Sequence, residues 1–568
     1  MAIFPCEIRR HSRRISIKNY PLLRFPQGVV LPLRHKMSGS DVGNVSPLAS
    51  GSSGDLAQKK GLEPVVLAVS TEYQQLKGPH LYWEGIKSVV MAKAPTMEAP
   101  LEYGGHRVAE EPTKLGFFGV IKKFGRFFGP GMILAIAYCD PDNFQTSVED
   151  GQDFGYKFLF MVLISLLMAI FLQVLCLRMA TVTGLNLAQM NHKYMPRWLE
   201  LLVYAVAEAC CICTDISAVI GAAYAWNILI PKLPLSAACV ITAADSLLIL
   251  LFYSPTGKLR NIRAFELFMV GLVLVIFITT AVCLGQVSPP PGPVFKGFLP
   301  SREIFVSDGM YSTCGMIGGM LMPHALYVGS SIAQPRLLEY DEKYHLTTYR
   351  RGEAPIDVFY RPSLRAIKST MRYATWELCL SIFVVGLFVN CAPEIVSGAA
   401  FSQYGDFDDL YSLYNLFQTA LNQLSATMFT VAFLFSGIAA GIVSTMAGQT
   451  VMEGAWQIKV NPFVRRLITR CIAIIPALIV TVSVGPAGLS NALTAVNYIL
   501  AIGLIFVLLP VVWYVTHDKY MTVPNDDGTG YVSMKLGLTA TILAWIIWAI
   551  VIITDIATLV LLGLGLSD

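Results

Sequence analysis

Long runs of apolar residues recur along most of this chain, and short polar segments separate them. A helix needs about 20 mostly apolar residues to cross the hydrocarbon core of a bilayer. The runs are continuous rather than alternating, which favours membrane helices over a membrane β-barrel. The pattern therefore predicts an all-α polytopic membrane protein with about eleven transmembrane helices. They cover roughly residues 128–149, 158–178, 199–227, 234–253, 265–284, 310–332, 377–397, 422–448, 466–485, 490–515 and 534–563.

Basic residues fall in every second connection between these runs, and this alternation orients the predicted helices. The segment before the first run and the loops after the second, fourth, sixth and eighth runs are rich in Lys and Arg. The loops after the first and seventh runs carry acidic residues instead. Cytoplasmic loops hold the excess of Lys and Arg in membrane proteins. We therefore expect the amino terminus to be cytoplasmic and the carboxyl terminus to lie on the other side.

The amino-terminal segment differs in composition from the rest of the chain. Up to Lys36 it contains eight basic residues against the single acidic Glu7, and Ser, Gly and Pro are frequent after that position. We expect residues 1–112 to form a disordered, basic cytoplasmic tail. An arginine-rich, acid-poor stretch also fits a transit peptide, and Met37 is an alternative start. The rest is expected to divide into residues 113–284 with helices 1–5, residues 285–515 with helices 6–10, and residues 516–568 with a loop and helix 11.

Composition and charge exclude a soluble enzyme. The 568 residues are 54% apolar and 14% charged, whereas soluble proteins carry about 25% charged residues. The net charge of +4 is too small to suggest a nucleic-acid partner, and twelve cysteines in a chain of this length are no disulfide scaffold. The sequence has no nucleotide phosphate loop. If the protein moves a solute across the membrane, an ion gradient rather than ATP would then drive it, and the expected partners are ions and the lipid bilayer.

Two predicted helices contain a proline beside polar residues. Helix 1 reads Asp-Pro-Asp-Asn at 140–143, and helix 6 reads Met-Pro-His at 322–324. Proline removes a backbone donor and clashes with the preceding turn, so each helix should be interrupted there. Each break opens a block of five helices, which is typical of inverted five-helix repeats with a substrate site at the membrane midplane. Two ordinary proline kinks are the alternative.

The groups at the two breaks are of the kinds that bind metal ions. Asp140 offers a carboxylate, Asn143 an amide oxygen and Met322 a thioether. The breaks also free backbone carbonyls near Ala137 and Gly319. Oxygen ligands alone favour Mg²⁺ or Ca²⁺, whereas one sulfur ligand shifts the preference toward Mn²⁺, Fe²⁺ and later transition metals. The alternative for Met322 is ordinary packing, but its position directly before the proline favours the ligand.

Few other ionisable residues lie within the apolar runs, where each is costly. Glu208 and Asp215 are seven positions apart in helix 3 and share a face of that helix, and Arg470 lies near the start of helix 9. Together with His324 they indicate a proton route, because carboxylates and imidazole exchange protons near neutral pH. The alternative is a buried ion-pair network, and for Asp245 in helix 4 we prefer such a structural role.

At these residues the sequence resembles the Nramp family of divalent-metal transporters. The matching motifs are those at 140–143 and 322–324, with Ser-Thr-Met-Ala-Gly-Gln-Thr-Val-Met-Glu-Gly at 444–454 in helix 8. Fungal manganese and iron members look most similar, given Phe-Leu-Gln at 171–173 and Ser-Ser-Ile-Ala-Gln-Pro-Arg at 330–336. The resemblance covers roughly residues 115–520.

The resemblance implies a leucine-transporter-like fold and proton-coupled uptake of Mn²⁺ or Fe²⁺ into the cytosol. Carried over by position, the implied metal ligands are Asp140, Asn143 and Met322 with the backbone carbonyls of Ala137 and Gly319. The implied proton-coupling residues are His324, Glu208, Asp215 and Arg470. The metal is then the transported substrate, and no cofactor is expected.

The chain departs from the family pattern at several positions. Asp142 replaces a glycine, and it is a candidate for modifying selectivity. Directed inward, it would strengthen the binding of hard divalent ions; directed outward, it would only gather cations. Ala218 stands where the family has an acidic residue, which removes one group of the proton route. Helix 8 reads Gly-Ile-Ala-Ala-Gly at 437–441 in place of a polar run, and helix 10 has Asn491 where Gln is customary.

The function that these observations favour is secondary-active, proton-coupled transport of Mn²⁺ and Fe²⁺ toward the cytosol, rather than enzymatic activity. Three alternatives stay open: a Mg²⁺-type or broad divalent-cation relative with weak proton coupling, a carrier of small organic solutes, and a non-transporting metal sensor or scaffold. Asp140 would repel a substrate carboxylate, and Met322 argues against a Mg²⁺ specialist. The sequence is compatible with a plasma, endosomal or vacuolar membrane.

Overall fold

A computed structural model describes residues 129–251, 259–347, 358–400, 410–456, 485–525 and 530–564, together with 97–98 and most of 471–479. The predicted tail, 1–112, lies outside the described residues except for Met97–Glu98. Arg470 also lies outside them, and the predicted ninth helix is described only in part.

The first half of the described chain is helical. It consists of α3 (Pro130–Ala137), α4 (Pro141–Phe154), α5 (Leu159–Thr183), α6 (Leu187–Tyr194), α7 (Arg197–Leu229), α8 (Leu235–Leu251) and α9 (Leu259–Leu284). Helix α5 is apolar along most of its length and ends at Gly184, whose φ of 74° is the left-handed conformation that terminates many helices. Helix α6 begins with a capping box, in which the side chains of Asn186 and Gln189 each accept the other's backbone N–H at 2.9 Å.

The second half repeats this helical character. It consists of α10 (Pro291–Gly297), the 3₁₀ helix η1 (Arg302–Phe305), α11 (Ser307–Leu321), α12 (Pro323–Ser331), α13 (Gln334–Lys343), α14 (Leu364–Ala400), α15 (Leu410–Ala420), α16 (Gln423–Trp456), α18 (Gly485–Thr516) and α19 (Leu538–Leu564). The described strands form two short ladders. β1 (Met97–Glu98) pairs in parallel with β2 (Val358–Phe359), with Met97 opposite Val358. β3 (Thr522–Pro524) pairs antiparallel with β4 (Tyr531–Ser533) between α18 and α19.

The described helices agree with the predicted spans. Seven are long and apolar enough to cross a membrane, namely α5, α7, α9, α14, α16, α18 and α19. The pairs α3–α4 and α11–α12 are the two predicted broken helices, and the 17-residue α8 matches the predicted fourth span. The described part of 471–479 is helical, as predicted for the ninth.

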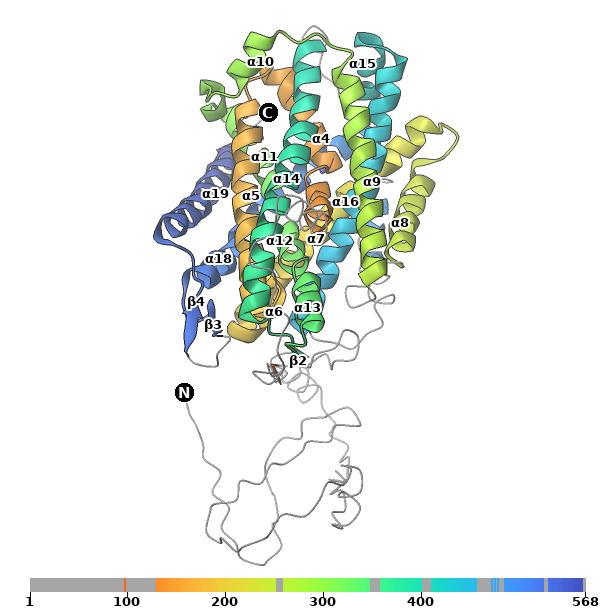
Figure 1. Ribbon diagram of the computed structural model, residues 1–568. Helices are drawn as coiled ribbons and strands as arrows, with labels where there is room; N and C mark the ends of the chain where they lie inside the picture. The colour runs from red at the N-terminus through yellow and green to blue at the C-terminus, as the bar shows by residue number, and fades with distance from the viewer. Residues whose placement is uncertain are drawn as a thin grey trace, which may run out of the picture. The chain divides into compact units, whose positions relative to one another are not determined.

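The two broken helices run in opposite directions, as inverted repeats require. In Figure 1 the orange pair α3–α4 rises toward α10 and α15, whereas the green pair α11–α12 descends toward α13. The two pairs meet within the bundle, and α14, α16, α7 and α18 pack around them. The chain thus has the leucine-transporter-like arrangement of two inverted repeats.

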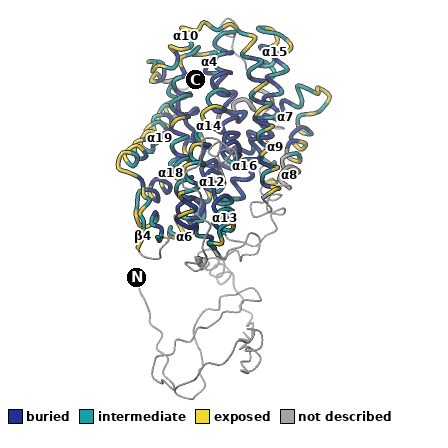
Figure 2. The backbone as a smooth tube through the Cα atoms, viewed as in Figure 1, coloured by how far each residue is buried: buried dark blue, intermediate teal, exposed yellow. Residues whose placement is uncertain are grey.

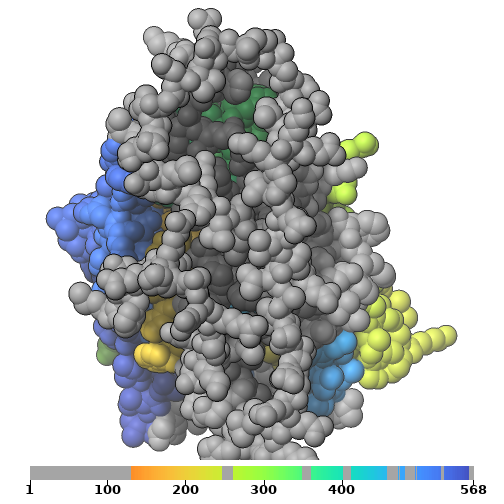
Figure 3. Space-filling view, turned by 90° about the horizontal axis from the view of Figure 1, so that it is seen from below, coloured from red at the N-terminus to blue at the C-terminus, as the bar shows by residue number. Residues whose placement is uncertain are grey.

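Buried residues fill the centre of the bundle, and exposed residues lie on its outer helices (Figure 2). Large apolar side chains that a soluble protein would bury are exposed, including Leu267 of α9 (72% exposed), Trp376 of α14 (65%) and Ile553 of α19 (65%). These faces suit the lipid tails of a bilayer. Helices α19 and α8 lie on opposite flanks in Figure 1, and Figure 3 shows described residues on the same two flanks.

The structure differs from the predicted spans mainly at helix ends. Helix α14 begins at Leu364 rather than near residue 377, so Arg365, Lys368 and Arg372 lie on its first turns and not in a loop. Hydropathy detects only the apolar stretch within the bilayer, and polar turns that extend a helix beyond it escape notice. The short helices α6, α10, α13 and α15 were not predicted for the same reason, because none has an apolar run of membrane length.

Candidate functional site

The break in the first helix is built by Pro141. Helix α3 ends at Ala137, and α4 begins at Pro141 with Asp140 in an extended conformation before it. In a continuous helix the carbonyl of Ala137 would accept the N–H of residue 141, but proline has none. Asp140 is fully buried, and neither of its carboxylate oxygens has a hydrogen-bond partner among the described residues. A carboxylate and a carbonyl are thereby left to bind something else.

The break in the sixth helix is also produced by a proline, Pro323. Helix α11 ends at Leu321 and α12 begins at Pro323, so the carbonyl of Gly319 likewise loses its helical donor. Met322 lies between the two helices, fully buried, with a φ of 30° that is uncommon for any residue other than glycine. Strained backbone of this kind is concentrated at functional sites.

The two breaks are in direct contact. The side-chain amide of Asn143 on α4 donates a hydrogen bond to the carbonyl oxygen of Gly319 on α11, over 3.1 Å. A Cβ atom added to Gly319 would lie 2.2 Å from the amide oxygen of Asn143, so glycine is what allows this approach. The structure therefore brings Asn143 and Gly319 together and buries Ala137, Asp140 and Met322 at the adjoining helix ends.

A further amide at this place was missed by the sequence reasoning. Asn497 of α18 is fully buried, and its side-chain oxygen would lie 2.9 Å from a Cβ on Gly319. Its side-chain nitrogen donates to the hydroxyl of Thr146 on α4 over 3.2 Å. The family pattern had singled out Asn491, whose side chain lies outside the described residues. The available signal was that Asn497 is one of two amides in the apolar run 490–515.

Asp142 lies inside the protein rather than on its surface. It is 1% exposed, and neither carboxylate oxygen has a hydrogen-bond partner in the described part of the chain. It stands in the first turn of α4, two residues after Asp140. Burying charge without a fixed partner is costly, so two such carboxylates two residues apart in the chain would attract a cation.

The residues proposed for a proton route lie beside the second break. His324, the second residue of α12, has its Nδ1 atom 3.2 Å from the hydroxyl of Thr214 on α7. The next residue of α7, Asp215, accepts a hydrogen bond from Ser444 of α16. Glu208, two turns earlier, has one carboxylate oxygen buried without a partner among the described side chains. The structure thus groups His324 and Asp215 closely, with Glu208 further along the same helix.

The departure at Ala218 coincides with very close helix packing. Ala218 is fully buried on α7. A Cβ atom added to Gly437 of α16 would lie 2.7 Å from the backbone oxygen of Ala218. Small residues at such a contact let membrane helices approach closely. The small residues on both helices thus allow α7 and α16 to approach closely. Ala218 itself has no ionisable group.

The start of α3 is held by a buried acidic group that the sequence reasoning did not single out. Glu377 of α14 accepts the backbone N–H of Gly129 at 3.0 Å and that of Gly131 at 3.0 and 2.9 Å. Beside it, Arg336 of α13 donates to both carboxylate oxygens of Glu266 on α9, each at 3.0 Å. The first set of contacts ties the start of α3 to α14, and the ion pair beside it ties α13 to α9.

The candidate ligands are chemically mixed. No group of three or more His, Cys, Asp or Glu residues that could hold a metal ion is found among the described residues. The set at the breaks instead combines carboxylate, amide, thioether and carbonyl groups.

Comparison with known proteins agrees with the family resemblance. The sequence model described as "Natural resistance-associated macrophage protein-like" matches residues 131–561. The manganese transporter pdt1 of Schizosaccharomyces pombe is 40% identical over 461 residues, which cover 79% of this chain and 87% of that protein. The iron transporter SMF3 of Saccharomyces cerevisiae is 40% identical over 421 residues, covering 72% and 86%. A crystal structure of the Eremococcus coleocola manganese transporter matches with a TM-score of 0.64 and 26% identity, covering 82% of this chain and 89% of that one.

Proposed function

Because the chain belongs to the Nramp family, we propose that it transports Mn²⁺, and Fe²⁺ as a second substrate, across a membrane toward the cytosol. The observation that carries the proposal is the contact between the two broken helices, where Asn143 meets Gly319 beside the unpartnered carboxylate of Asp140. The similarity to proteins named manganese and iron transporters supports the choice of metals.

In this proposal the ion is bound by both repeats at once. Asp140 supplies the negative charge, Asn143 and the carbonyls of Ala137 and Gly319 supply neutral oxygens, and Met322 supplies the sulfur. A thioether binds Ca²⁺ and Mg²⁺ poorly, so it favours the transition metals over more abundant hard ions. Because ligands come from two repeats, rocking of residues 113–284 against 285–515 would open the site to one side and then the other.

We further propose that protons move with the metal through His324, Asp215 and Glu208 on one side of the site. The contacts of His324 with Thr214 and of Asp215 with Ser444 support a connected polar path. Arg470, outside the described residues, completes the set by position. With Ala218 in the chain, this path has one ionisable group fewer than the family pattern. The coupling is therefore expected to be weaker than in relatives that keep an acidic residue there.

The direction follows from the proposed topology. The basic loops place the amino-terminal tail, 1–112, in the cytoplasm, and a proton gradient directed inward would then drive metal inward. Transport rather than enzymatic catalysis is supported by the relatives, which are named as transporters.

The test is Mn²⁺ uptake by the purified protein in proteoliposomes, with and without an inward proton gradient. We expect uptake that the gradient accelerates and that excess Ca²⁺ does not suppress. Asp140→Ala should abolish uptake, because it removes the one carboxylate of the proposed ligand set. Asp245→Asn, which removes a carboxylate from the peripheral helix α8, should leave it unchanged. Substantial uptake by Asp140→Ala would overturn the site, and metal binding without any uptake would favour a sensor or scaffold.

One observation favours a second candidate, a broad divalent-cation transporter. The buried carboxylate of Asp142 adds negative charge and hard oxygen ligands close to Asp140, and hard ligands favour Mg²⁺ and Ca²⁺. Asp142→Gly should therefore weaken inhibition of Mn²⁺ uptake by Mg²⁺ or Ca²⁺, by about tenfold in the inhibitory concentration. Asp142→Asn is the matched control, because it removes the charge but keeps the shape. Competition that neither variant alters would exclude a role of Asp142 in selectivity.

A further inference from the structure

A second pair of buried carboxylates lies beyond the candidate site, at the far end of α4. Asp150 of α4 is 1% exposed and Glu394 of α14 is 0% exposed. Neither carboxylate oxygen of Glu394, nor the Oδ2 atom of Asp150, has a hydrogen-bond partner among the described residues. Buried carboxylates without a countercharge are costly, so these groups require an explanation.

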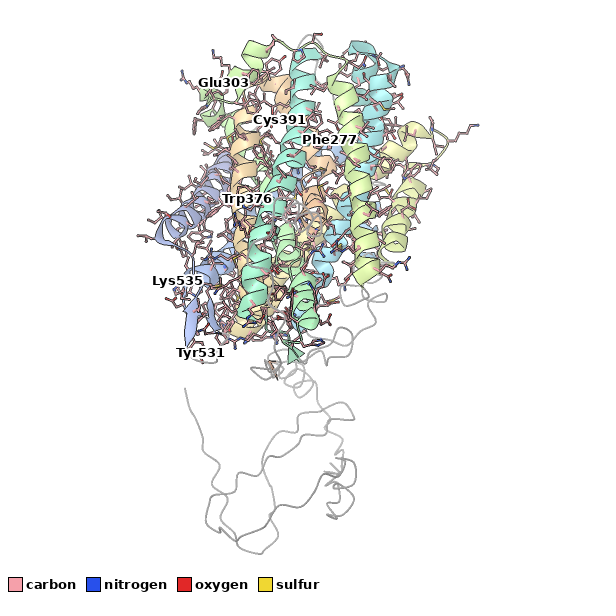
Figure 4. The ribbon with its side chains drawn as sticks, in the orientation of Figure 1. Phe277, Glu303, Trp376, Cys391, Tyr531 and Lys535 are labelled. Carbon is pink, nitrogen blue, oxygen red and sulfur yellow. The ribbon has the colours of Figure 1, made fainter. Side chains whose placement is uncertain are left out.

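The two helices hold this pair rigidly. A Cβ atom on Gly151 would lie 2.4 Å from the backbone oxygen of Glu394, so the two backbones touch at the pair itself. The hydroxyl of Ser397 donates to the carbonyl of Val148 over 2.7 Å, which fixes the register one turn further on. Asp150 and Glu394 are close enough to interact electrostatically. Figure 4 labels Cys391, which precedes Glu394 by about one turn, in the upper part of α14.

Each carboxylate has polar groups near it, but none of them carries a positive charge. The carboxylate of Glu394 faces the backbone N–H groups of Phe158 and Leu159, where α5 begins. Asp150 receives the hydroxyl of Ser312 from α11. Helix starts and hydroxyl donors stabilise an anion in place, and they supply no positive charge that would occupy it.

On α4, α5, α11, α14 and α18, within the residues that the structure describes, no basic side chain lies at the level of the pair. Helices α4, α11 and α18 contain no Lys or Arg. Those of α5 and α14 lie toward the opposite ends of their helices, at Arg178 and at or before Arg372. Lys157, the basic residue just before α5, is half exposed and pairs with Glu303 at 2.6 Å. A bound cation or a proton is therefore what can neutralise Asp150 and Glu394, and the two carboxylates together offer the oxygen ligands that a divalent cation takes.

The pair is connected to the candidate site along one face of α4. Asp142, Thr146 and Asp150 follow each other at four-residue intervals, and residues so spaced are neighbours on a helix surface. At 1.5 Å per residue, Asp150 lies about 12 Å along the helix from Asp142. Thr146, between them, accepts the hydrogen bond from Asn497. Oxygen-bearing side chains thus lead, one turn at a time, from the outer pair to the midplane.

We propose that Asp150 and Glu394 form an outer divalent-cation site that binds the transported metal ion on its way to Asp140. The proposal rests on the proposed function, since it takes the transported ion as the ligand. Its ligands are all hard oxygens, so it accepts Mn²⁺ without the discrimination that Met322 gives the inner site. The outer site collects the ion, and the inner site selects it.

The test is equilibrium binding of Mn²⁺ to the purified full chain, followed by the electron paramagnetic resonance signal of free Mn²⁺. Asp140→Ala should lose the inner site and keep one weaker site. Adding Glu394→Gln to Asp140→Ala should weaken that remaining site by about tenfold or more. Adding Asp153→Asn instead should leave it intact, because Asp153 is an exposed carboxylate one turn further along α4. Asp140→Ala protein that binds no Mn²⁺, or whose binding survives both Glu394→Gln and Asp150→Asn, overturns the outer site.

A failure of the proposed function would give a different result. Wild-type protein that neither binds nor transports Mn²⁺ overturns both proposals, whereas normal transport without a residual site in Asp140→Ala overturns only this one. In proteoliposomes, Glu394→Gln alone should raise the KM for Mn²⁺ by about tenfold and leave the maximal rate unchanged. The metal-free Glu394→Gln protein should be at least as resistant to thermal unfolding as wild type, because a buried unpaired charge has been removed.

Discussion

The candidate site depends on two backbone carbonyls, those of Ala137 and Gly319, that lose their helical hydrogen-bond donor to a proline. It also depends on the small size of Gly319, which lets the side chain of Asn143 approach. Ala137 and Gly319 each stand four residues before a proline, so the same backbone rule releases both oxygens. Gly319 has a second role, because its missing side chain makes room for the amide of Asn143. The close contact of Asn143 with Gly319 therefore depends on the absence of a side chain at residue 319.

Gly319→Ala tests that contact. The new methyl group would lie 2.2 Å from the amide oxygen of Asn143 and must displace it, so we expect the affinity for Mn²⁺ to fall by about tenfold. Gly271→Ala on α9 is the control, since a Cβ there meets nothing within 4 Å. Both variants should fold, because alanine is the better helix former by about 0.5–1 kcal/mol. Mn²⁺ affinity unchanged in Gly319→Ala would show that Asn143 does not bind the ion in this orientation.

The sequence was informative where chemistry and spacing coincide, and less so where contacts join distant segments. Asp140, Asn143 and Met322 stand beside prolines, and a proline in an apolar run predicts a break. The role of Glu377 could not be predicted in this way, because its partner Gly131 lies 246 positions away. Asn497 was missed because one amide in an apolar helix gives no indication of which turn faces the site. The assignment of metal and proton groups stays a prediction.

Among the helices, α3 is attached at its start through polar contacts. Its first turn leaves backbone N–H groups without helical partners, and the carboxylate of Glu377 accepts those of Gly129 and Gly131. The ion pair of Arg336 with Glu266 lies next to this contact. The position of α3, which leads to the candidate ligands, therefore depends in part on Glu377 of α14.

Glu377→Gln should loosen this attachment. Hydrogen bonds to a charged group contribute about 1.5–3 kcal/mol each, and an amide both loses the charge and brings donors toward the N–H groups. We expect hydrogen exchange of the backbone amides in residues 129–137 to accelerate by at least about tenfold. Protection equal to that of wild type would show that α3 is held by its apolar packing alone.

Glu303→Gln provides the control for this measurement. It breaks the exposed pair with Lys157 at the other end of the bundle, and exposed ion pairs contribute little. The hydrogen bond from Lys157 holds the pKa of Glu303 below its usual value. The pair is therefore intact at neutral pH and is lost only as the pH falls into the acid range. Exchange in α3 should not change in Glu303→Gln at neutral pH.

At the scale of the whole molecule, the directions of the helices require the ninth crossing. Helix α16 starts near Cys283, whose thiol contacts Ser425, and ends near Arg197, which donates to Ala455. Helix α18 ends on the same side of the bundle as α16. Its Tyr514 contacts Met190 of α6, and α6 comes directly before Arg197 in the chain. Two successive helices that run in the same direction need one crossing between them. The ninth helix predicted from the apolar run 466–485 would supply that crossing, and the described residues within 471–479 are helical.

An odd number of crossings places the two ends of the chain on opposite sides of the membrane. With an epitope tag at each end, we expect protease added outside sealed vesicles of known orientation to remove one tag and spare the other. The amino-terminal tag should be on the cytoplasmic side, because the basic loops alternate from that end. A tag inserted at 526–529, between α18 and α19, serves as the control and should behave like the amino-terminal one. Both end tags on one side would mean an even number of crossings. The parallel directions of α16 and α18 would still require one crossing between them. The predicted helix that fails to cross the membrane would then be a different one from 466–485.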